Sequence, residues 1–181
     1  MAEEDIKQVL TEADCLHDKK EVEQALDRMA VAMTERLKDK NPLMLCVVTG
    51  GIIPMGHLIT RLNFPLQLDY IHATRYQGDT SGGTLEWKVK PSIELKGRVV
   101  VLVDDVLDKG ITLRELIKYC KDEQASEVYS TVLVEKLQQR PFDIKADFTG
   151  IETVDRYLFG YGMDYKTWLR NADGIYAVKG M

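Results

Sequence analysis

An uninterrupted apolar run at residues 99–103 constrains the fold of this chain more than any other stretch of its sequence. Such a run is typical of a strand that is buried on both faces of a parallel sheet. Two adjacent carboxylates, Asp104 and Asp105, follow where we expect this strand to end, and Asp108, Lys109 and Gly110 form the loop beyond them. The run therefore predicts a central strand whose end carries acidic side chains.

A helix is predicted to begin after this loop, at Thr112, whose hydroxyl can cap the helix while Glu115 completes a capping box. The N–H groups at a helix N-terminus and the positive end of its dipole suit a phosphate group. The carboxylates of Asp104 and Asp105 suit the hydroxyls of a sugar or a hard cation. A solvated loop end is the alternative for the acidic pair, and the buried strand, glycine and helix cap beside it make this alternative the weaker one.

The composition is that of a single globular domain. The chain has 181 residues, of which 45% are hydrophobic and 29% charged, and these fractions argue against disorder. A formal net charge of −5 argues weakly against nucleic acid as the main partner. No apolar segment has the length of a membrane span, and the acidic N-terminus lacks the pattern of a signal peptide. The cysteines at positions 15, 46 and 120 are scattered, which indicates a protein of the reducing cytoplasm.

Strands and helices are predicted to alternate along the chain. Asp18 and Glu21 form a candidate capping box, and apolar residues then recur at helical spacing from Val22 to Leu37. Further strands are predicted at residues 43–48, 66–73, 84–90, 128–134, 147–151, 156–160 and 175–178, with helices over about 54–61 and 113–120. This alternation indicates an α/β domain with a largely parallel sheet.

Two glycine-containing segments leave more than one interpretation open. Thr49, Gly50 and Gly51 follow the strand predicted at residues 43–48, where they either let the backbone approach a ligand or form a tight turn. Spacing alone favours the turn. Residues 75–83 are polar and rich in glycine, which is typical of both a mobile lid and a hairpin loop.

The segment at residues 99–112, VVVLVDDVLDKGIT, resembles the phosphoribosyl-diphosphate (PRPP) signature of the type I phosphoribosyltransferases. Further segments resemble the 6-oxopurine branch of that family and occur in the same order. They are Thr49-Gly50-Gly51, Arg75-Tyr76, Lys136 after a strand, and YLFGYGMDY at residues 157–165 with Arg170 beyond. The resemblance spans residues 43–178, and it makes the chain similar to the hypoxanthine-guanine phosphoribosyltransferases.

The resemblance implies transfer of ribose 5-phosphate from PRPP to N9 of hypoxanthine or guanine, with Mg²⁺ as the cofactor and IMP or GMP plus pyrophosphate as products. It also implies a mostly parallel central sheet flanked by helices, with a small hood formed by the terminal segments. On this expectation residues 1–181 form one domain, whose core is at about 40–140 and whose hood combines the N-terminal arm with about 141–181. The family is usually dimeric or tetrameric, so we expect a homo-oligomer that binds neither nucleic acid nor membrane.

The resemblance assigns one group of residues to PRPP. Its members are Thr49, Gly50, Arg75, Tyr76, Asp104, Asp105, Asp108, Lys109, Gly110, Ile111, Thr112 and Arg170. Asp104, Asp105 and Asp164 are the implied metal ligands. Arg170 is implied to bind pyrophosphate, which a bidentate guanidinium suits. Because the positively charged ribose must be shielded from water during the reaction, the resemblance implies that residues 75–87 form a closing lid.

A second group of residues is assigned to the purine and to catalysis. Lys136 is implied to donate to the 6-oxo group, and Tyr157 to stack on the base. The backbone at Leu158 and Asp164 then meets the purine edge. Asp108 is implied to act as general base or acid near N7, so Asp108 and Lys136 are the expected catalytic residues.

The chain departs from the pattern of the family at three positions. Lys109 stands where the family usually has a small hydroxyl residue, Thr49 where many relatives have lysine, and Arg75 where many have serine. At these positions we expect contacts to phosphate or pyrophosphate through the backbone, and Lys109 offers an ammonium group in place of a hydroxyl.

Two other classes of protein share parts of this pattern. A signalling receiver domain has an acidic pair after a buried strand and a lysine after a later one, but its pair follows the first strand, whereas strands at 43–48 and 66–73 precede this pair. A non-catalytic regulator of the same fold that senses PRPP or nucleotides is the second alternative. The acidic charge and the presence of both Asp108 and Lys136 argue against it.

Overall fold

The computed structural model describes residues 3–75 and 85–181. Its larger sheet has six strands in the order β4-β3-β2-β5-β6-β7. They are β2 (Leu43–Val47), β3 (Gln67–Arg75), β4 (Leu85–Val89), β5 (Val99–Leu107), β6 (Glu127–Leu137) and β7 (Phe148–Val154). Neighbouring strands run parallel except for β3 and β4, which are antiparallel. The prediction of an α/β fold with a mostly parallel sheet is therefore confirmed.

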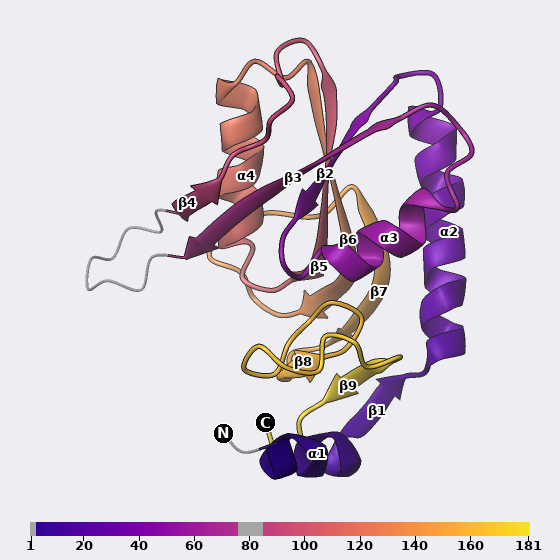
Figure 1. Cartoon of the computed structure of the whole chain (residues 1–181), viewed down its shortest axis with the longest axis vertical. Helices are drawn as coiled ribbons and strands as arrows, with labels where there is room; N and C mark the ends of the chain where they lie inside the picture. Colours follow the sequence, from indigo (N-terminus) through magenta and orange to yellow (C-terminus); the bar gives the residue numbers. More distant parts are fainter. Residues whose placement is uncertain (1–2, 76–84) are drawn as a thin grey trace.

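Helices cover both faces of this sheet (Figure 1). Helices α2 (Lys19–Leu37) and α3 (Ile52–Ile59) lie on one face, and α4 (Ile111–Asp122) lies on the other. Alternate residues of β5 face the two layers, so Val101 and Val103 pack on the side of α2 while Val100 and Leu102 pack on the side of α4. The apolar run is continuous because both of its faces are covered, as the sequence predicts.

Strand β5 continues four residues beyond the apolar run to Leu107, so the prediction that it ends before Asp104 was wrong. The neighbouring strand β6 causes this extension of β5. Parallel pairing of β5 with β6 extends to the pair Leu107↔Glu135 and holds the acidic residues within the ladder. Successive strand residues point to opposite faces, so Asp104 and Asp105 are aimed in different directions.

Helix α2 begins with the predicted capping box. The backbone N–H of Glu21 donates to Asp18 Oδ1 over 2.9 Å, and the backbone N–H of Asp18 donates to Glu21 Oε2 over 2.9 Å. The apolar residues at helical spacing are buried against the sheet, among them Val22, Leu26 and Met33. Burial of each such side chain contributes roughly 1.5–3 kcal/mol. Among the residues described, no helix combines the length and the apolar character needed to cross a bilayer.

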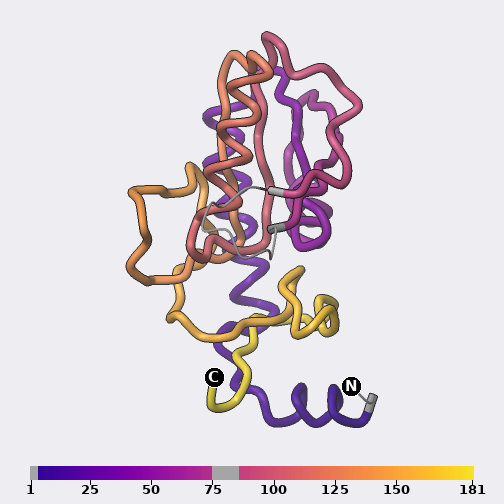
Figure 2. The backbone as a smooth tube through the Cα atoms, turned by 90° about the vertical axis from the view of Figure 1, so that its left-hand side faces the viewer, coloured from indigo at the N-terminus to yellow at the C-terminus, as the bar shows by residue number. Residues whose placement is uncertain are grey.

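A second, three-stranded sheet with the order β1-β9-β8 forms the hood. Its strands are β1 (Asp14–His17), β8 (Leu158–Phe159) and β9 (Ile175–Ala177), and helix α1 (Glu3–Glu12) packs beside it. Both ends of the chain lie at this end of the molecule (Figures 1 and 2). Strand β7 pairs with β6 in the large sheet, so the hood begins after β7 and not at about residue 141 as expected.

The hood is tied to the helices that cover the large sheet. The Tyr161 hydroxyl donates to Glu23 Oε1 on α2 over 2.8 Å, and the same carboxylate lies 3.2 Å from His57 Nδ1 on α3. Arg61, just past α3, donates to Asp27 and to the other oxygen of Glu23. This network fixes the segment that follows β8 against the core.

Candidate active site

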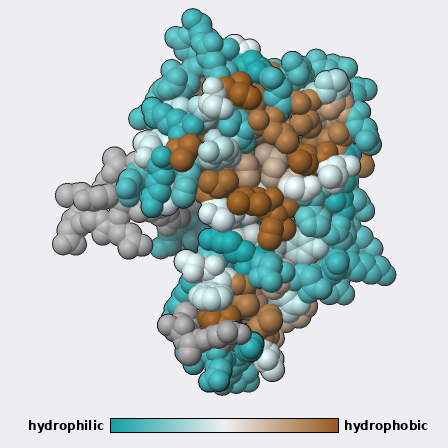
Figure 3. Space-filling view, viewed as in Figure 1, coloured by the Kyte–Doolittle hydropathy of each residue, from teal (hydrophilic) through white to brown (hydrophobic). Residues whose placement is uncertain are grey.

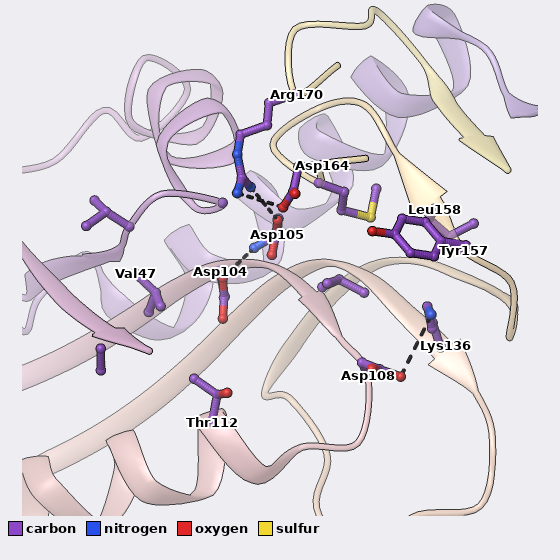
Figure 4. Close-up of a pocket in the computed structure, with 15 residues that line it drawn as sticks. Val47, Asp104, Asp105, Asp108, Thr112, Lys136, Tyr157, Leu158, Asp164 and Arg170 are labelled. Carbon is purple, nitrogen blue, oxygen red and sulfur yellow. Dashed lines mark hydrogen bonds and ion pairs between the residues drawn. The ribbon is translucent and has the colours of Figure 1, made fainter. Parts of the chain in front are cut away.

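A cavity of about 440 Å³ opens between the carboxyl ends of the parallel strands and the hood. Ligands of open α/β sheets bind at such strand ends. The residues of the sequence assignment that line it are Gly50, Asp104, Asp105, Asp108, Thr112, Lys136, Tyr157, Leu158, Asp164 and Arg170 (Figure 4). The structure therefore brings together most of the side chains that the sequence singled out. Apolar walls that the sequence reasoning missed come from Val47, Ala73, Val106 and Met163.

The acidic pair lies in a poorly hydrated wall of this cavity. Asp104 points toward Thr112, while Asp105 points toward Arg170 and Asp164 (Figure 4). The backbone N–H of Asp105 donates to Asp104 Oδ1 over 2.9 Å. Burial raises the pKa of Asp104 well above its ordinary value, and the charge of Asp105 raises it further. Burial also raises the pKa of Asp105, against the opposing effects of Asp104 and Arg170. Two desolvated carboxylates side by side favour a cationic ligand.

Arg170 supplies the positive charge on one side of this pair. Its Nη2 lies 2.6 Å from Asp164 Oδ1, its Nη1 donates to the Gly162 carbonyl over 2.6 Å, and Nη1 lies 3.9 Å from Asp105 Oδ2. The other oxygen of Asp164 accepts the backbone N–H of Thr167 over 2.6 Å. The arginine predicted to bind pyrophosphate thus bridges the two carboxylates nearest to it.

The predicted metal ligands, Asp104, Asp105 and Asp164, do not form one compact set. Within residues 3–75 and 85–181, no group of three or more His, Cys, Asp or Glu residues converges as a metal-binding cluster. One reason is the guanidinium of Arg170, which lies between Asp105 and Asp164. Carboxylates still fit Mg²⁺, because this cation is usually bound by one or two carboxylates together with waters and substrate phosphates.

Asp108 and Lys136 lie together at the ends of β5 and β6. Lys136 Nζ is 3.8 Å from Asp108 Oδ1 and 3.2 Å from Asp155 Oδ1, and only 14% of the lysine side chain is exposed. The side-chain amide of Gln138 also donates to Asp108 Oδ1. The expected catalytic pair is therefore in contact before any ligand binds.

The loop after Asp108 leads into α4 through a glycine. Gly110 is the N-cap residue of α4 and has φ = 76°, a left-handed conformation that glycine adopts readily. The predicted capping box of Thr112 and Glu115 is wrong, because the helix begins at Ile111 and its N-cap makes no side-chain hydrogen bond. Thr112 therefore lies in the first turn, where it lines the cavity. Gly110 lines a smaller adjoining cavity of about 210 Å³, and Lys109 is exposed.

Close packing against Asp105 requires glycine at position 50, which a tight turn alone would not. A Cβ atom at this position would lie 2.1 Å from Asp105 Oδ2, so only glycine lets this backbone approach the acidic pair. The neighbouring Val48–Thr49 peptide bond is cis. Thr49 itself is exposed and does not line the cavity. The side chain of Arg75, the whole of Tyr76 and the residues between β3 and β4 lie outside the described part, so the predicted lid stays a prediction.

Tyr157 stands at the opposite end of the cavity from Thr112. Its ring lies above Lys136 and beside Leu158 (Figure 4), and 40% of the residue is exposed. The ring of Tyr165 contacts it edge-on, with 5.5 Å between the two ring centroids. An exposed aromatic face over a lysine and the apolar side chains of Val106 and Met163 suits a planar heterocycle with a polar edge.

Replacing Asp104 with Asn is expected to raise the melting temperature of the protein in EDTA at neutral pH. Because its pKa is raised on folding, Asp104 binds more protons in the native than in the unfolded state. The free energy of unfolding therefore falls as the pH rises from the ordinary range of an aspartate through the raised pKa. The stabilisation by Asp104→Asn should thus shrink as the pH is lowered into that ordinary range.

Thermal unfolding across a pH series measures this effect. Asp143→Asn, at an exposed position on the connection between β6 and β7, is the matched control and should melt like the wild type. A pH-independent change in melting temperature for Asp104→Asn would contradict the burial of its charge.

Comparison with known proteins agrees with this geometry. Residues 12–167 match the family described as "Phosphoribosyl transferase domain". The chain is 31% identical over 180 residues to a hypoxanthine-guanine phosphoribosyltransferase of Streptococcus pneumoniae, covering 99% of this chain and 97% of the relative. It is 30% identical over 165 residues to the hypoxanthine-guanine-xanthine phosphoribosyltransferase of Tritrichomonas foetus, covering 91% and 90%.

Among solved structures, the fold is similar to that of a hypoxanthine phosphoribosyltransferase from Staphylococcus aureus. The TM-score is 0.87 at 22% identity, with 92% of this chain and 91% of the other covered. The match of the family spans most of the chain, and the cavity combines an acidic pair, a glycine-initiated helix and a lysine–aspartate pair. The chain therefore belongs to the phosphoribosyl transferase domain family.

Proposed function

We propose that this protein is an enzyme of purine salvage, which transfers ribose 5-phosphate from PRPP to N9 of hypoxanthine or guanine. The observation that carries the proposal is a single cavity with two chemically distinct ends. The acidic pair and the start of α4 lie at one end, and Tyr157 lies over Lys136 at the other. A phosphorylated sugar matches the first end and an oxopurine matches the second.

The sugar phosphate would bind at the start of α4. Backbone N–H groups of residues 108–112 and the hydroxyl of Thr112 are suited to the 5′-phosphate, because a helix N-terminus attracts an anion. Asp104 and Asp105 would accept hydrogen bonds from the ribose hydroxyls or bind the cation that accompanies PRPP. Mg²⁺, when bound there, neutralises charge on the phosphates.

Departure of pyrophosphate would depend on Arg170. The C1′–O bond breaks as positive charge grows on the ribose carbon and negative charge on the leaving group. Arg170 would exchange its bonds with Asp164 and Asp105 for the pyrophosphate, which a guanidinium binds bidentately. A preorganised cation at this position stabilises the developing charge.

The purine would lie between Tyr157 and the apolar wall formed by Val106 and Met163. Lys136 would donate to the 6-oxo group, and the main chain at Leu158 and Asp164 would meet the opposite edge of the base. As N9 forms its bond with C1′, Asp108 would accept the proton from N7. The purine ring of the product nucleotide is then uncharged. Proton transfer of this kind contributes roughly 10²–10⁴-fold in rate.

Incubation of the protein with PRPP, Mg²⁺ and each purine base tests the proposal, with nucleotide and pyrophosphate measured together. Stoichiometric formation of IMP from hypoxanthine and GMP from guanine is the expected result. A protein that binds PRPP or nucleotides with no turnover of any base would instead be the non-catalytic regulator considered above. Omission of Mg²⁺ should abolish product formation.

We also propose that the enzyme acts in the cytoplasm as a homo-oligomer. The described cysteines, Cys15, Cys46 and Cys120, are all free thiols, which fits a reducing compartment. Apolar side chains gather over α3 and the neighbouring part of β3 (Figure 3), including Ile52, Leu68 and Tyr70, which are 50%, 47% and 47% exposed. An exposed apolar patch of this kind suits a contact between copies.

Tyr70→Glu is expected to shift the protein toward monomers, because a carboxylate within an apolar contact is left desolvated and unpaired. Sedimentation velocity over a range of protein concentrations measures the change. Leu10→Glu, at an exposed position on α1, is the control and should sediment like the wild type. Equal sedimentation of all three proteins would exclude this face as the contact.

A further inference from the structure

The connection between β6 and β7 holds a nearly buried arginine beside the proposed catalytic pair. Arg140 and Glu135 form an ion pair with 2.9 Å between Nη1 and Oε1, and each side chain is only 12% exposed. The second oxygen of Glu135 accepts a hydrogen bond of 3.1 Å from the hydroxyl of Thr149 on β7. The guanidinium is therefore anchored at one end by a carboxylate that is itself fixed to the sheet.

The remaining donors of Arg140 bind main-chain carbonyls at the ends of two strands. Its Nε donates to the carbonyl of Asp108 over 2.9 Å, and its Nη2 donates to the carbonyl of Lys136 over 2.8 Å. A longer contact of 3.4 Å joins Nη2 to the carbonyl of Leu107. One planar group thus contacts the backbone of both residues to which catalysis is assigned.

The contacts of Arg140 with Asp108 and Lys136 lie just beyond the last paired residues of β5 and β6. The last paired residues of β5 and β6 are Leu107 and Glu135, so the β5–β6 ladder does not join Asp108 to Lys136, although Lys136 is still paired with Thr153 of β7 on its other side. Without another link, the backbone of Asp108 would be free to move away from that of Lys136. The fixed fork of a guanidinium joins them across the gap.

A second contact from the same connection acts on the side chain of Asp108. The amide of Gln138 donates to Asp108 Oδ1, the oxygen that also faces Lys136 Nζ at 3.8 Å. An amide held there restricts the rotation of the carboxylate. Main chain and side chain of Asp108 are therefore both held by residues 138–140.

We propose that Arg140 and Gln138 are positioning residues, which hold Asp108 and Lys136 at the separation that purine attack requires. Neither group lines the cavity at the base, so each acts through the residues it holds. This inference rests on the proposed function. Misplacement of a catalytic group by about 1 Å is enough to cost roughly 10²-fold in rate.

Arg140→Lys is the informative substitution at the first position. It keeps a positive charge near Glu135, but a single ammonium cannot reach the carbonyls of Asp108 and Lys136 in the fork geometry. Gln138→Ala removes only the contact with the Asp108 carboxylate. Each variant is expected to lower kcat by about 10- to 100-fold while the KM for PRPP changes far less.

Two control variants separate positioning from stability. Arg114→Lys makes the same chemical change at a guanidinium on α4, which lies 4.1 Å from the ring centroid of Phe142 on the β6–β7 connection. Among the bonds described, Arg114 contacts neither Asp108 nor Lys136. This variant should therefore keep the kcat of the wild type. Glu135→Gln weakens the ion pair but leaves the carbonyl contacts of Arg140 in place, so it should lower the melting temperature and keep most of kcat.

A double-mutant cycle with Asp108→Asn completes the test. Once the proton-transfer group is absent, the loss caused by Gln138→Ala should disappear and that caused by Arg140→Lys should shrink. Wild-type kcat in both positioning variants, or losses that simply add to that of Asp108→Asn, would overturn the inference. If Arg140→Lys does not fold, the Gln138→Ala cycle decides alone. A wild-type protein that makes no nucleotide would instead refute the proposed function.

Discussion

Asp108→Asn lowers kcat by about 10²- to 10⁴-fold, the usual contribution of a positioned proton-transfer group. The substitution keeps the size of the side chain and its capacity to accept the hydrogen bond from Gln138. It removes the carboxylate that would take the proton from N7. The affinity for PRPP should change little, because the backbone of the phosphate loop is untouched. Steady-state kinetics with hypoxanthine at saturating PRPP measures the result.

Asp143→Asn serves as the matched control for this substitution, because it makes the same chemical change at an exposed site outside the cavity. Its kcat should equal that of the wild type. An unchanged kcat for Asp108→Asn would remove this residue from catalysis, and a large rise in the KM for PRPP alone would assign it to substrate binding.

Lys136→Ala should lower kcat/KM for hypoxanthine and guanine by about 10- to 100-fold, the value of a lost hydrogen bond to a charged group. Lys136 Nζ lies within the cavity and below the ring of Tyr157, where the 6-oxo group of the base is expected (Figure 4). A purine without a 6-oxo group should be affected far less. The ratio of kcat/KM between the two kinds of base is therefore the quantity to measure.

The ratio of kcat/KM between bases with and without a 6-oxo group is needed because Lys136 also contacts Asp108 and Asp155. Loss of the lysine also disturbs Asp108, and this part of the effect is the same for every base. Lys145→Ala, an exposed lysine on the following connection, is the control and should keep wild-type kinetics. An equal loss with all bases would contradict direct recognition of the oxo group by Lys136.

The sequence predicts the parts of this fold that depend on local pattern. Residues 100–103 are buried on both faces of the sheet, and Asp18 and Glu21 form their capping box, because periodicity and capping are properties of neighbours in the chain. The end of β5 was misjudged because its length is set by pairing with β6, a partner distant in sequence. The hood boundary was misplaced for the same reason.

The site shows the same division. The acidic pair, the glycine before α4 and Lys136 carry local signatures, whereas Gln138 and Arg140 carry none and acquire a role only through contacts with residues about thirty positions away. The three aspartates predicted as metal ligands do not converge in one cluster within the described residues, because Arg170 lies between Asp105 and Asp164 and its placement cannot be read from the spacing of the aspartates. Residue types predict chemistry, and long-range packing decides which groups meet.

The strand order of the hood has a consequence for biosynthesis. Strand β9 lies between β1 and β8, so β1 waits for the last of the described strands to be made. The large sheet is complete at Val154, so all of its strands and the proposed phosphate loop are made before β8 and β9. The proposed purine end of the cavity, which includes Tyr157 and Leu158, gains its supporting sheet only when residues 175–177 have been made. A nascent chain would therefore acquire its sugar-phosphate cradle first and its base pocket last.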